Sequence, residues 1–234
     1  STESAARLYA QALHIIETLD SMEKGLRDWD EFGVLRVGAT ITLGNFLLPE
    51  LAARFQQRHP HLQLRAVVSN GAQLSQHLLE NTIDLALIEG SILPQRVSEP
   101  FSGDHLQLIL PPGHPLSERK SLSLEELAEE PFLLRERGSA GREFLDHVFA
   151  AHQLPLTPLW ESASTQAIIK AVGAGLGVSF LPEKLVSQAI AEGSVRTVPI
   201  ENEPFCRTHH IVYHRHKFLT QSAREFIALC HEME

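Results

Sequence analysis

The first thirty residues carry the most regular spacing of apolar side chains in the chain. Apolar residues recur every seven positions, and a second set follows each of them three positions later, which is the a/d pattern of a coiled coil. No proline interrupts the stretch, which predicts a helix of about 30 residues. We expect its apolar stripe to pack on a second protomer; the alternative is a helix folded onto its own domain. The residues expected at the interface are Leu8, Ile15, Leu19, Met22 and Leu26.

Beyond Gly33 the pattern changes to short apolar runs that alternate with amphipathic segments. The runs predict strands and the amphipathic segments predict helices, in two sets. Such alternation is typical of parallel sheets covered on both faces, so we expect two α/β lobes. The predicted strands are 34–39, 62–68, 83–88, 105–110, 132–135, 158–162, 176–181 and 207–214, and the predicted helices are 44–58, 72–80, 123–128, 140–151, 164–173, 183–191 and 218–232.

Two polar, turn-rich segments, 96–104 and 195–203, lie between the two sets of elements. We interpret them as the strands by which the chain passes from one lobe to the other and back. A ligand site then lies in the cleft, at the carboxyl ends of strands and the amino ends of helices. The predicted parts are a helix over 1–32, a first lobe over 33–98 completed by 200–234, and a second lobe over 99–199.

Composition narrows the functional classes. With 43% hydrophobic and 21% charged residues among 234, and only 2 Cys, the chain is not disordered, collagen-like or a disulfide scaffold. Its net charge of −9 disfavours nucleic-acid binding by this part of the protein. Apolar runs fall far short of the ~20 residues of a membrane span, and no signal peptide opens the chain, so we expect a cytoplasmic protein. Cys206 and Cys230 lack ligand or redox spacing and are expected to be structural thiols.

Hydroxyl groups and small residues follow the first predicted strand. Thr40, Thr42, Gly44 and Asn45 lie before or within the first turn of a predicted helix. Backbone N–H groups, the helix dipole and two hydroxyls can together form an anion site here. The alternative is that Thr42 only caps the helix.

Other candidates lie at further strand ends. Asn70 and Glu89 follow the second and third strands, although ordinary turn residues show the same pattern. Ser164 and Thr165 precede an apolar helix, where a capping role is the simpler explanation. Arg135 opens a segment with further arginines that favours either a bidentate anion contact or a solvated loop.

Signals for metal binding and catalysis are weak. His214 and His216 share one face of a predicted strand, but no Asp, Glu or Cys is suitably spaced beside them, so we expect no metal. GxSxG, HExxH and paired carboxylates at helical spacing are missing, so no catalytic residue is expected. The glycine-rich run at 173–178 lies between a helix and a strand, the reverse of the order in dinucleotide loops. It is expected to end the helix and allow close packing, and no cofactor is predicted.

Several blocks in this order resemble the effector-binding region of LysR-type transcriptional regulators. The opening, STESAARLYAQALHIIETLDSMEKGL, is similar to the end of the family's DNA-binding domain running into its linker helix. The matching blocks are LRVGATITLGNFLLPELAARFQQRHPHLQL at 35–64, IDLALIEG at 83–90, LILPPGHPLS at 108–117, ESASTQAIIKAVGAGLGVSFLPE at 161–183 and IVYHRHKFLTQSAREFI at 211–227.

This resemblance implies a type II periplasmic-binding-protein-like fold, with two Rossmann-like lobes, two crossovers and an effector in the cleft. It also implies a winged helix-turn-helix before Ser1, and linker helices that pair in dimers, which commonly form tetramers. Members with a Thr-x-Thr pair often resemble sensors of sulfur oxyanions, phosphates and carboxylates. Glu89 conflicts with an anion unless it is protonated or paired with an arginine. By family position, the effector contacts are Thr40, Thr42, Gly44, Asn45, the strand ends around Asn70 and Glu89, and Ser164 or Thr165.

We therefore predict the effector-sensing and oligomerisation region of a LysR-type DNA-binding regulator. A small anionic metabolite in the cleft would change oligomer geometry and so transcription. One alternative is a free-standing solute-binding protein of the same fold, which would be a monomer. Another is an enzyme with a reactive cleft pair such as Glu89 and Arg135. Thiol sensing is not expected, because the redox-sensing branch uses two cysteines in the second lobe, whereas Cys206 and Cys230 fall in the late segment.

Overall fold

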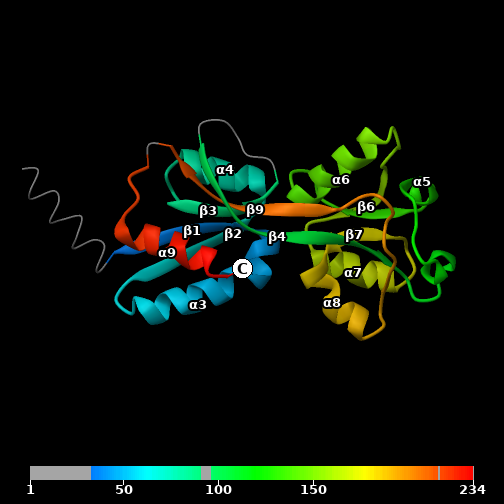
Figure 1. Cartoon of the computed structure of the whole chain (residues 1–234), viewed down its shortest axis with the longest axis horizontal. Coiled ribbons are helices and arrows are strands. Elements are labelled where there is room, and N and C mark those ends of the chain that lie inside the picture. Colours follow the sequence, from blue (N-terminus) through cyan, green and yellow to red (C-terminus); the bar gives the residue numbers. More distant parts are fainter. Residues whose placement is uncertain (1–32, 91–95, 216, 234) are drawn as a thin grey trace, which may run out of the picture.

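The computed structural model describes residues 33–90, 96–215 and 217–233. They form two α/β lobes that lie side by side and are joined by two long strands (Figure 1). The segment before residue 33 lies outside the described residues, and so does His216. The heptad prediction therefore stays a prediction for Leu8, Ile15, Leu19, Met22 and Leu26.

The first lobe is built on three parallel strands in the order β2-β1-β3. One face carries α2, α3 and α9, whose apolar residues form the main core of this lobe, and the other face carries α4. The strands are β1 (Val34–Thr40), β2 (Gln63–Ser69) and β3 (Leu85–Glu89), and the helices are α2 (Ile41–Phe46), α3 (Leu48–Arg58), α4 (Gly71–Leu79) and α9 (Gln221–His231).

Two details of the first lobe differ from the prediction. The single helix expected over 44–58 is two helices, because Pro49 lies in the first turn of α3 and cannot continue a helix from α2. The sheet is also not covered on both faces throughout. As an edge strand, β2 leaves Val67 and Val68 exposed.

The second lobe repeats the arrangement on a smaller scale. Strand β5 pairs in parallel with β6, and Leu133 N–H donates to the carbonyl of Val178 at 2.9 Å, just before β7. Gly177 permits this approach, since a Cβ there would collide with the carbonyl oxygen of Pro131. The glycine run also ends α7 at Gly173, as predicted. The elements are η1 (Pro115–Glu118), α5 (Leu124–Leu127), β5 (Phe132–Arg135), α6 (Ala140–Ala151), β6 (Pro158–Ser162), α7 (Thr165–Gly173), β7 (Ser179–Pro182), α8 (Glu183–Ala191) and β8 (Arg196–Thr197).

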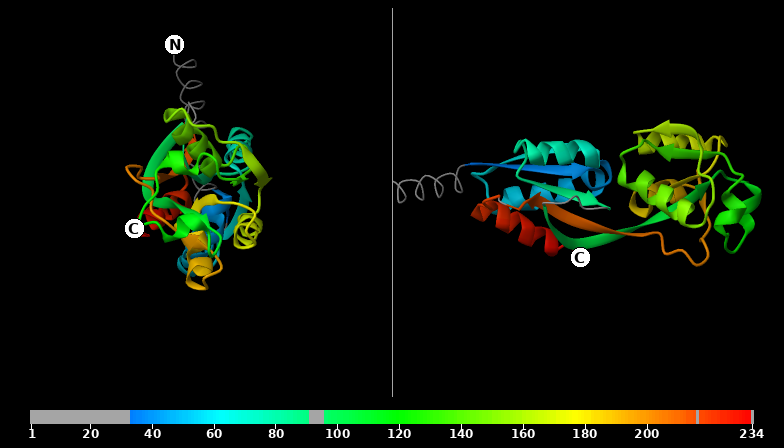
Figure 2. Two further views of the ribbon diagram at one scale, coloured as in Figure 1. Left: turned by 90° about the vertical axis from the view of Figure 1, so that its right-hand side faces the viewer. Right: turned by 90° about the horizontal axis from the view of Figure 1, so that it is seen from above.

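The lobes share one sheet, because β4 (Arg96–Leu110) and β9 (Cys206–His214) run antiparallel from one lobe into the other. Both strands lie along one side of the molecule (Figure 2). The crossing predicted at 96–104 is confirmed as the first part of β4. The return predicted at 195–203 is wrong, because β8 pairs with the second-lobe end of β4.

The return strand is β9, which pairs with both β3 and β4. Val198 and Phe205 still pack in the core of the second lobe, and Phe205 stacks on Phe180 with ring centroids 4.7 Å apart. These contacts hold the chain in that lobe until β9 begins. The exact boundaries of the lobes stay predictions. None of the helices within 33–90, 96–215 and 217–233 is long and apolar enough to cross a membrane.

Candidate functional site

The lobes face each other across a narrow cleft at the carboxyl ends of β1, β3 and β5. A Cβ built on Gly90 would lie 3.6 Å from that of Ala140 in the opposite lobe. Lys184 of α8 places Nζ 4.8 Å from the ring centroid of Phe46 in α2. The cavity that remains has a volume of about 20 Å³, which is room for about one water molecule. The side chains of the two lobes therefore nearly fill the cleft.

Five of the nine residues predicted as ligand contacts line this cavity: Thr40, Thr42, Asn70, Glu89 and Arg135. They come from both lobes. The remaining lining residues were not predicted, and they include Ser139, Ala140, Gly141 and Arg207.

The first-lobe wall presents two buried hydroxyls. Thr40 ends β1 and is 5% exposed, and its Oγ1 has no hydrogen-bond partner. It occupies the N-cap position of α2, yet its side chain caps nothing. Thr42 lies inside α2 and is also buried. The alternative that Thr42 is the helix cap is therefore wrong, and both residues remain available to a ligand.

Asn70 is the N-cap of α4. Its Oδ1 accepts a hydrogen bond from the backbone of Gln73 at 2.9 Å. This bond holds the start of the helix in place, and the first helical residue, Gly71, also lines the cavity. The partial positive charge of the α4 N-terminus consequently lies at the cleft.

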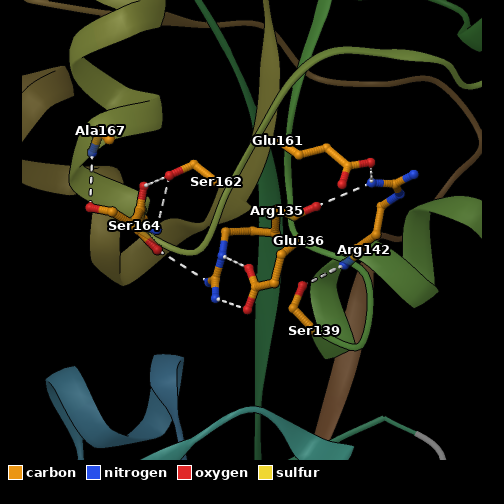
Figure 3. A network of polar contacts seen from close by, with 9 residues as sticks. Arg135, Glu136, Ser139, Arg142, Glu161, Ser162, Ser164 and Ala167 are labelled. Atoms are coloured by element: carbon orange, nitrogen blue, oxygen red, sulfur yellow. Dashed lines mark hydrogen bonds and ion pairs between the residues drawn. The ribbon is translucent and has the colours of Figure 1, made fainter.

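Arg135 is held at the end of β5 by its own lobe (Figure 3). Its Nε and Nη2 donate to the two carboxylate oxygens of Glu136 at 2.9 and 3.1 Å, and Nη1 donates to Thr165 Oγ1 at 3.3 Å. With 7% of its surface exposed, it is not on a solvated loop, and that alternative is wrong for this residue. Its guanidinium is positioned rather than free to move.

Arg142 is more buried than Arg135, and its guanidinium donates to three acceptors. Its side chain, 3% exposed, donates to Asp146 at 2.9 Å. It also donates to Glu161 at 2.8 Å and to the carbonyl of Arg135 at 3.2 Å (Figure 3). Burial acts to lower the pKa of Arg142, but its bonds to Glu161 and Asp146 outweigh it and raise the pKa. All of these contacts lie within the second lobe, so Arg142 supports the wall of the cleft.

The N-terminus of α6 completes the second-lobe wall. Ser139 caps this 12-residue helix by accepting a hydrogen bond from the backbone of Arg142 at 3.2 Å. Ala140 and Gly141 line the cavity, and N–H groups in the first turn of a helix have no intrahelical acceptor. Two helix N-termini therefore face the cleft from opposite lobes, an arrangement that favours an anion between them.

The other four predicted contact residues do not line the cavity. Gly44 lets α2 approach β2, since a Cβ there would lie 2.6 Å from Val68. Asn45 is exposed. Ser164 caps α7 through the backbone of Ala167 at 3.2 Å, and Thr165 acts on the cleft only through its bond to Arg135.

A buried charge cluster on the crossing strands was missed from sequence. Arg207 of β9 donates to Asp104 of β4 through Nε, at 2.9 Å, and Nη2. His209 Nε2 lies 3.4 Å from the same carboxylate. Burial acts to raise the pKa of Asp104, but His209 and Arg207 outweigh it and hold the pKa below its usual value. The sequence gives no clear signal for this cluster, because β4 and β9 contain several other polar and charged residues besides Asp104 and Arg207.

The reactive pair considered for an enzyme is not formed. Glu89 Oε1 lies 4.0 Å from Arg207 Nη2, while Arg135 is paired with Glu136. Among the described parts of the chain no three His, Cys, Asp or Glu side chains are grouped to hold a metal ion. Cys206 and Cys230 are both free thiols, and burial raises the pKa of Cys230 to about 12.

The family is decided by a match of residues 30–234 to the LysR substrate binding domain. The chain belongs to this family. It is 32% identical over 229 residues to the uncharacterized HTH-type transcriptional regulator YeiE of Escherichia coli K12, covering 97% of this chain and 77% of that protein. The RuBisCO operon transcriptional regulator of Allochromatium vinosum is also 32% identical, with 97% of this chain and 76% of that protein covered.

The solved structure of the CcmR regulatory domain of Synechocystis PCC6803 in complex with 2-PG has the same fold as this LysR domain. Its TM-score is 0.79 at 24% identity, over 85% of this chain and 96% of that one. The predicted two-lobed fold is confirmed, and this chain is the effector-binding domain of a LysR-type regulator. The relatives named here are transcriptional regulators, and the alternative of a free-standing solute-binding protein has no support.

Proposed function

We propose that this domain senses a small anion bound in the cleft between Thr40, Thr42 and the α4 N-terminus on one side and Arg135 and the α6 N-terminus on the other. The observation that carries the proposal is the convergence of these donors from both lobes on one cavity. The ligand in the CcmR structure, 2-PG, is likewise a small anion. We propose no catalytic step.

A ligand that contacts both walls favours the arrangement in which the lobes are close. It shifts the equilibrium only by the difference in its affinity for the closed and open arrangements. Strands β4 and β9 connect the lobes, so a change of lobe angle bends this pair of strands. In the full regulator such a change would reposition protomers and, through them, the DNA-binding heads.

The oligomer belongs to the same proposal. We infer a homodimer or homotetramer in the cytoplasm, with the heptad stripe as one interface and DNA bound through an N-terminal winged helix-turn-helix. Native mass spectrometry at low micromolar concentration tests this inference. A dimer or tetramer is expected, and a strict monomer would overturn the role of the heptad stripe.

The anion site is tested by replacing a hydroxyl without changing side-chain shape. Thr42→Val removes one donor, so the affinity for a bound anion should fall by roughly 1–3 kcal/mol. The measurement is isothermal titration calorimetry with phosphate, sulfate and glycolate, choosing the tightest binder of the wild type.

Thr208→Val is the matched control, because Thr208 is exposed on β9 and lies outside the cavity. Its affinity should equal that of the wild type. If Thr42→Val binds all three anions as tightly as the control does, Thr42 is not a ligand contact. If none of the anions binds the wild type, the proposed anion site itself is wrong.

A further inference from the structure

Glu89 has no partner that satisfies its carboxylate. It ends β3, is 4% exposed, and lines the cleft cavity. Its Oε1 is fully enclosed and accepts no hydrogen bond. The closest cation is Arg207, whose Nη2 lies 4.0 Å from Oε1, beyond hydrogen-bond distance.

Arg207 is committed elsewhere. Its Nε and Nη2 donate to the two carboxylate oxygens of Asp104. One guanidinium charge is therefore shared by two buried carboxylates, and the better geometry belongs to Asp104. A buried carboxylate oxygen without a donor is costly, so Glu89 in this position indicates a ligand that brings a donor with it.

The surrounding cavity is otherwise built for negative charge. Two helix N-termini and Arg135 face it, and Thr40 Oγ1 is a second enclosed polar atom without a partner. A fully deprotonated oxyanion would turn a bare oxygen toward Glu89 and be repelled. An oxyanion that keeps one proton can donate an O–H to Oε1 while its other oxygens accept from the helix ends and hydroxyls. A cavity of about 20 Å³ has room for about one water molecule, so any anion requires the lobes to move apart, and a compact ion requires the smallest movement.

We propose that Glu89 makes this cleft selective for a small oxyanion that retains a proton, such as hydrogen phosphate, over a fully deprotonated oxyanion of the same shape, such as sulfate. The inference rests on the proposed anion-sensing function and names the class of anion. Glu89 is the specificity-determining residue, and the helix ends and Arg135 supply charge neutralisation without distinguishing the two ions.

The test compares inorganic phosphate with sulfate near neutral pH by isothermal titration calorimetry. The wild type should bind phosphate at least about tenfold more tightly, the contribution of one charge-assisted hydrogen bond. In Glu89→Gln the amide N–H₂ can donate to a bare oxygen. Sulfate affinity should then rise and phosphate affinity fall, so that the preference is lost or reversed.

The first arm needs no variant, so a folding defect in Glu89→Gln cannot obscure it. Equal or tighter sulfate binding by the wild type would overturn the selectivity and leave the anion site standing. An unchanged preference for phosphate in a folded Glu89→Gln would overturn the role of Glu89. Glycolate that binds more tightly than phosphate and acetate would assign the donor to an organic hydroxyl and overturn the inorganic class. Failure of every anion to bind would instead remove the proposed function.

Discussion

Two buried carboxylates lie around one arginine in this domain, and only one of them is satisfied. Asp104 receives two hydrogen bonds from Arg207 and lies 3.4 Å from His209. Glu89, on the next strand but one, receives none, although its side chain is 1% exposed. The difference separates two roles. Asp104 joins the two crossing strands and supports the fold, whereas Glu89 is left for a ligand.

The strongest test of this difference between Asp104 and Glu89 is the effect of Asp104→Asn on stability. In Asp104→Asn the buried guanidinium of Arg207 loses its carboxylate partner, which should reduce the free energy of unfolding by about 3 kcal/mol. Urea denaturation measures it. Asp146→Asn is the control, since that carboxylate also pairs with a buried arginine but is 45% exposed, and it should cost less than about 1 kcal/mol. Equal losses would show that burial of Asp104 contributes nothing.

A smaller loss of stability is expected when position 207 keeps its positive charge but loses the planar guanidinium group. Arg207→Lys cannot donate two parallel hydrogen bonds to Asp104, so the free energy of unfolding should fall by roughly 1–2 kcal/mol. Arg58 makes a similar two-pronged pair with Glu232 on the surface, where both side chains are about half exposed. Arg58→Lys should change the urea midpoint little. A loss as large as that of Arg207→Lys would contradict the importance of burial.

The pH dependence of stability also tests whether the ionised carboxylate of Asp104 stabilises the fold. The pKa of Asp104 is below its usual value, so its stabilising contribution is complete above the unfolded-state pKa of about 3.9 and is lost as pH falls through the folded-state pKa. The difference in unfolding free energy between the wild type and Asp104→Asn should therefore shrink below about pH 4. Asp84, whose pKa is also lowered, is present in both proteins and cancels from the difference. A constant difference between pH 6 and pH 3 would contradict this assignment.

The smallest effect is expected for Glu89→Gln in the absence of ligand. Because Glu89 Oε1 accepts no hydrogen bond, the neutral amide should leave the free energy of unfolding unchanged or raise it by up to about 1 kcal/mol. The same urea titration as for Asp104→Asn measures it. A loss comparable to that of Asp104→Asn would show that Glu89 is a structural partner of Arg207, and the two carboxylates would then not differ in role.

Much of the secondary structure follows from local pattern. The predicted bounds of β5, α6, β6 and α8 agree with the structure, because apolar periodicity and capping residues such as Ser139 are local properties. The prediction of a return crossing at 195–203 was wrong because it, too, relied on local pattern alone. A polar segment has the same pattern whether it is a surface loop or a connection, and only the packing of Phe205 in the second lobe shows where the chain leaves it.

The candidate site also contains residues that local pattern predicts and residues whose role depends on tertiary structure. Thr40, Asn70, Glu89 and Arg135 were predicted because residues at the carboxyl ends of parallel strands gather at one edge of a sheet. Ser164 has the same local signal, but the structure uses it to cap α7 away from the cavity. Which strand ends meet depends on how the two lobes face each other.

The sequence by itself determined the two sets of elements and the hydroxyl and acidic residues at the strand ends, because these depend on spacing along a few neighbouring residues. It also indicated the family, through the resemblance of several blocks in the same order. Tertiary structure alone decided which carboxylate Arg207 would satisfy. Arg207 and Asp104 are 103 residues apart and meet through the antiparallel pairing of β4 and β9, whose register shifts between Pro100 and Ser102. That register pairs Asp104 with Arg207 and leaves Glu89 facing the cleft.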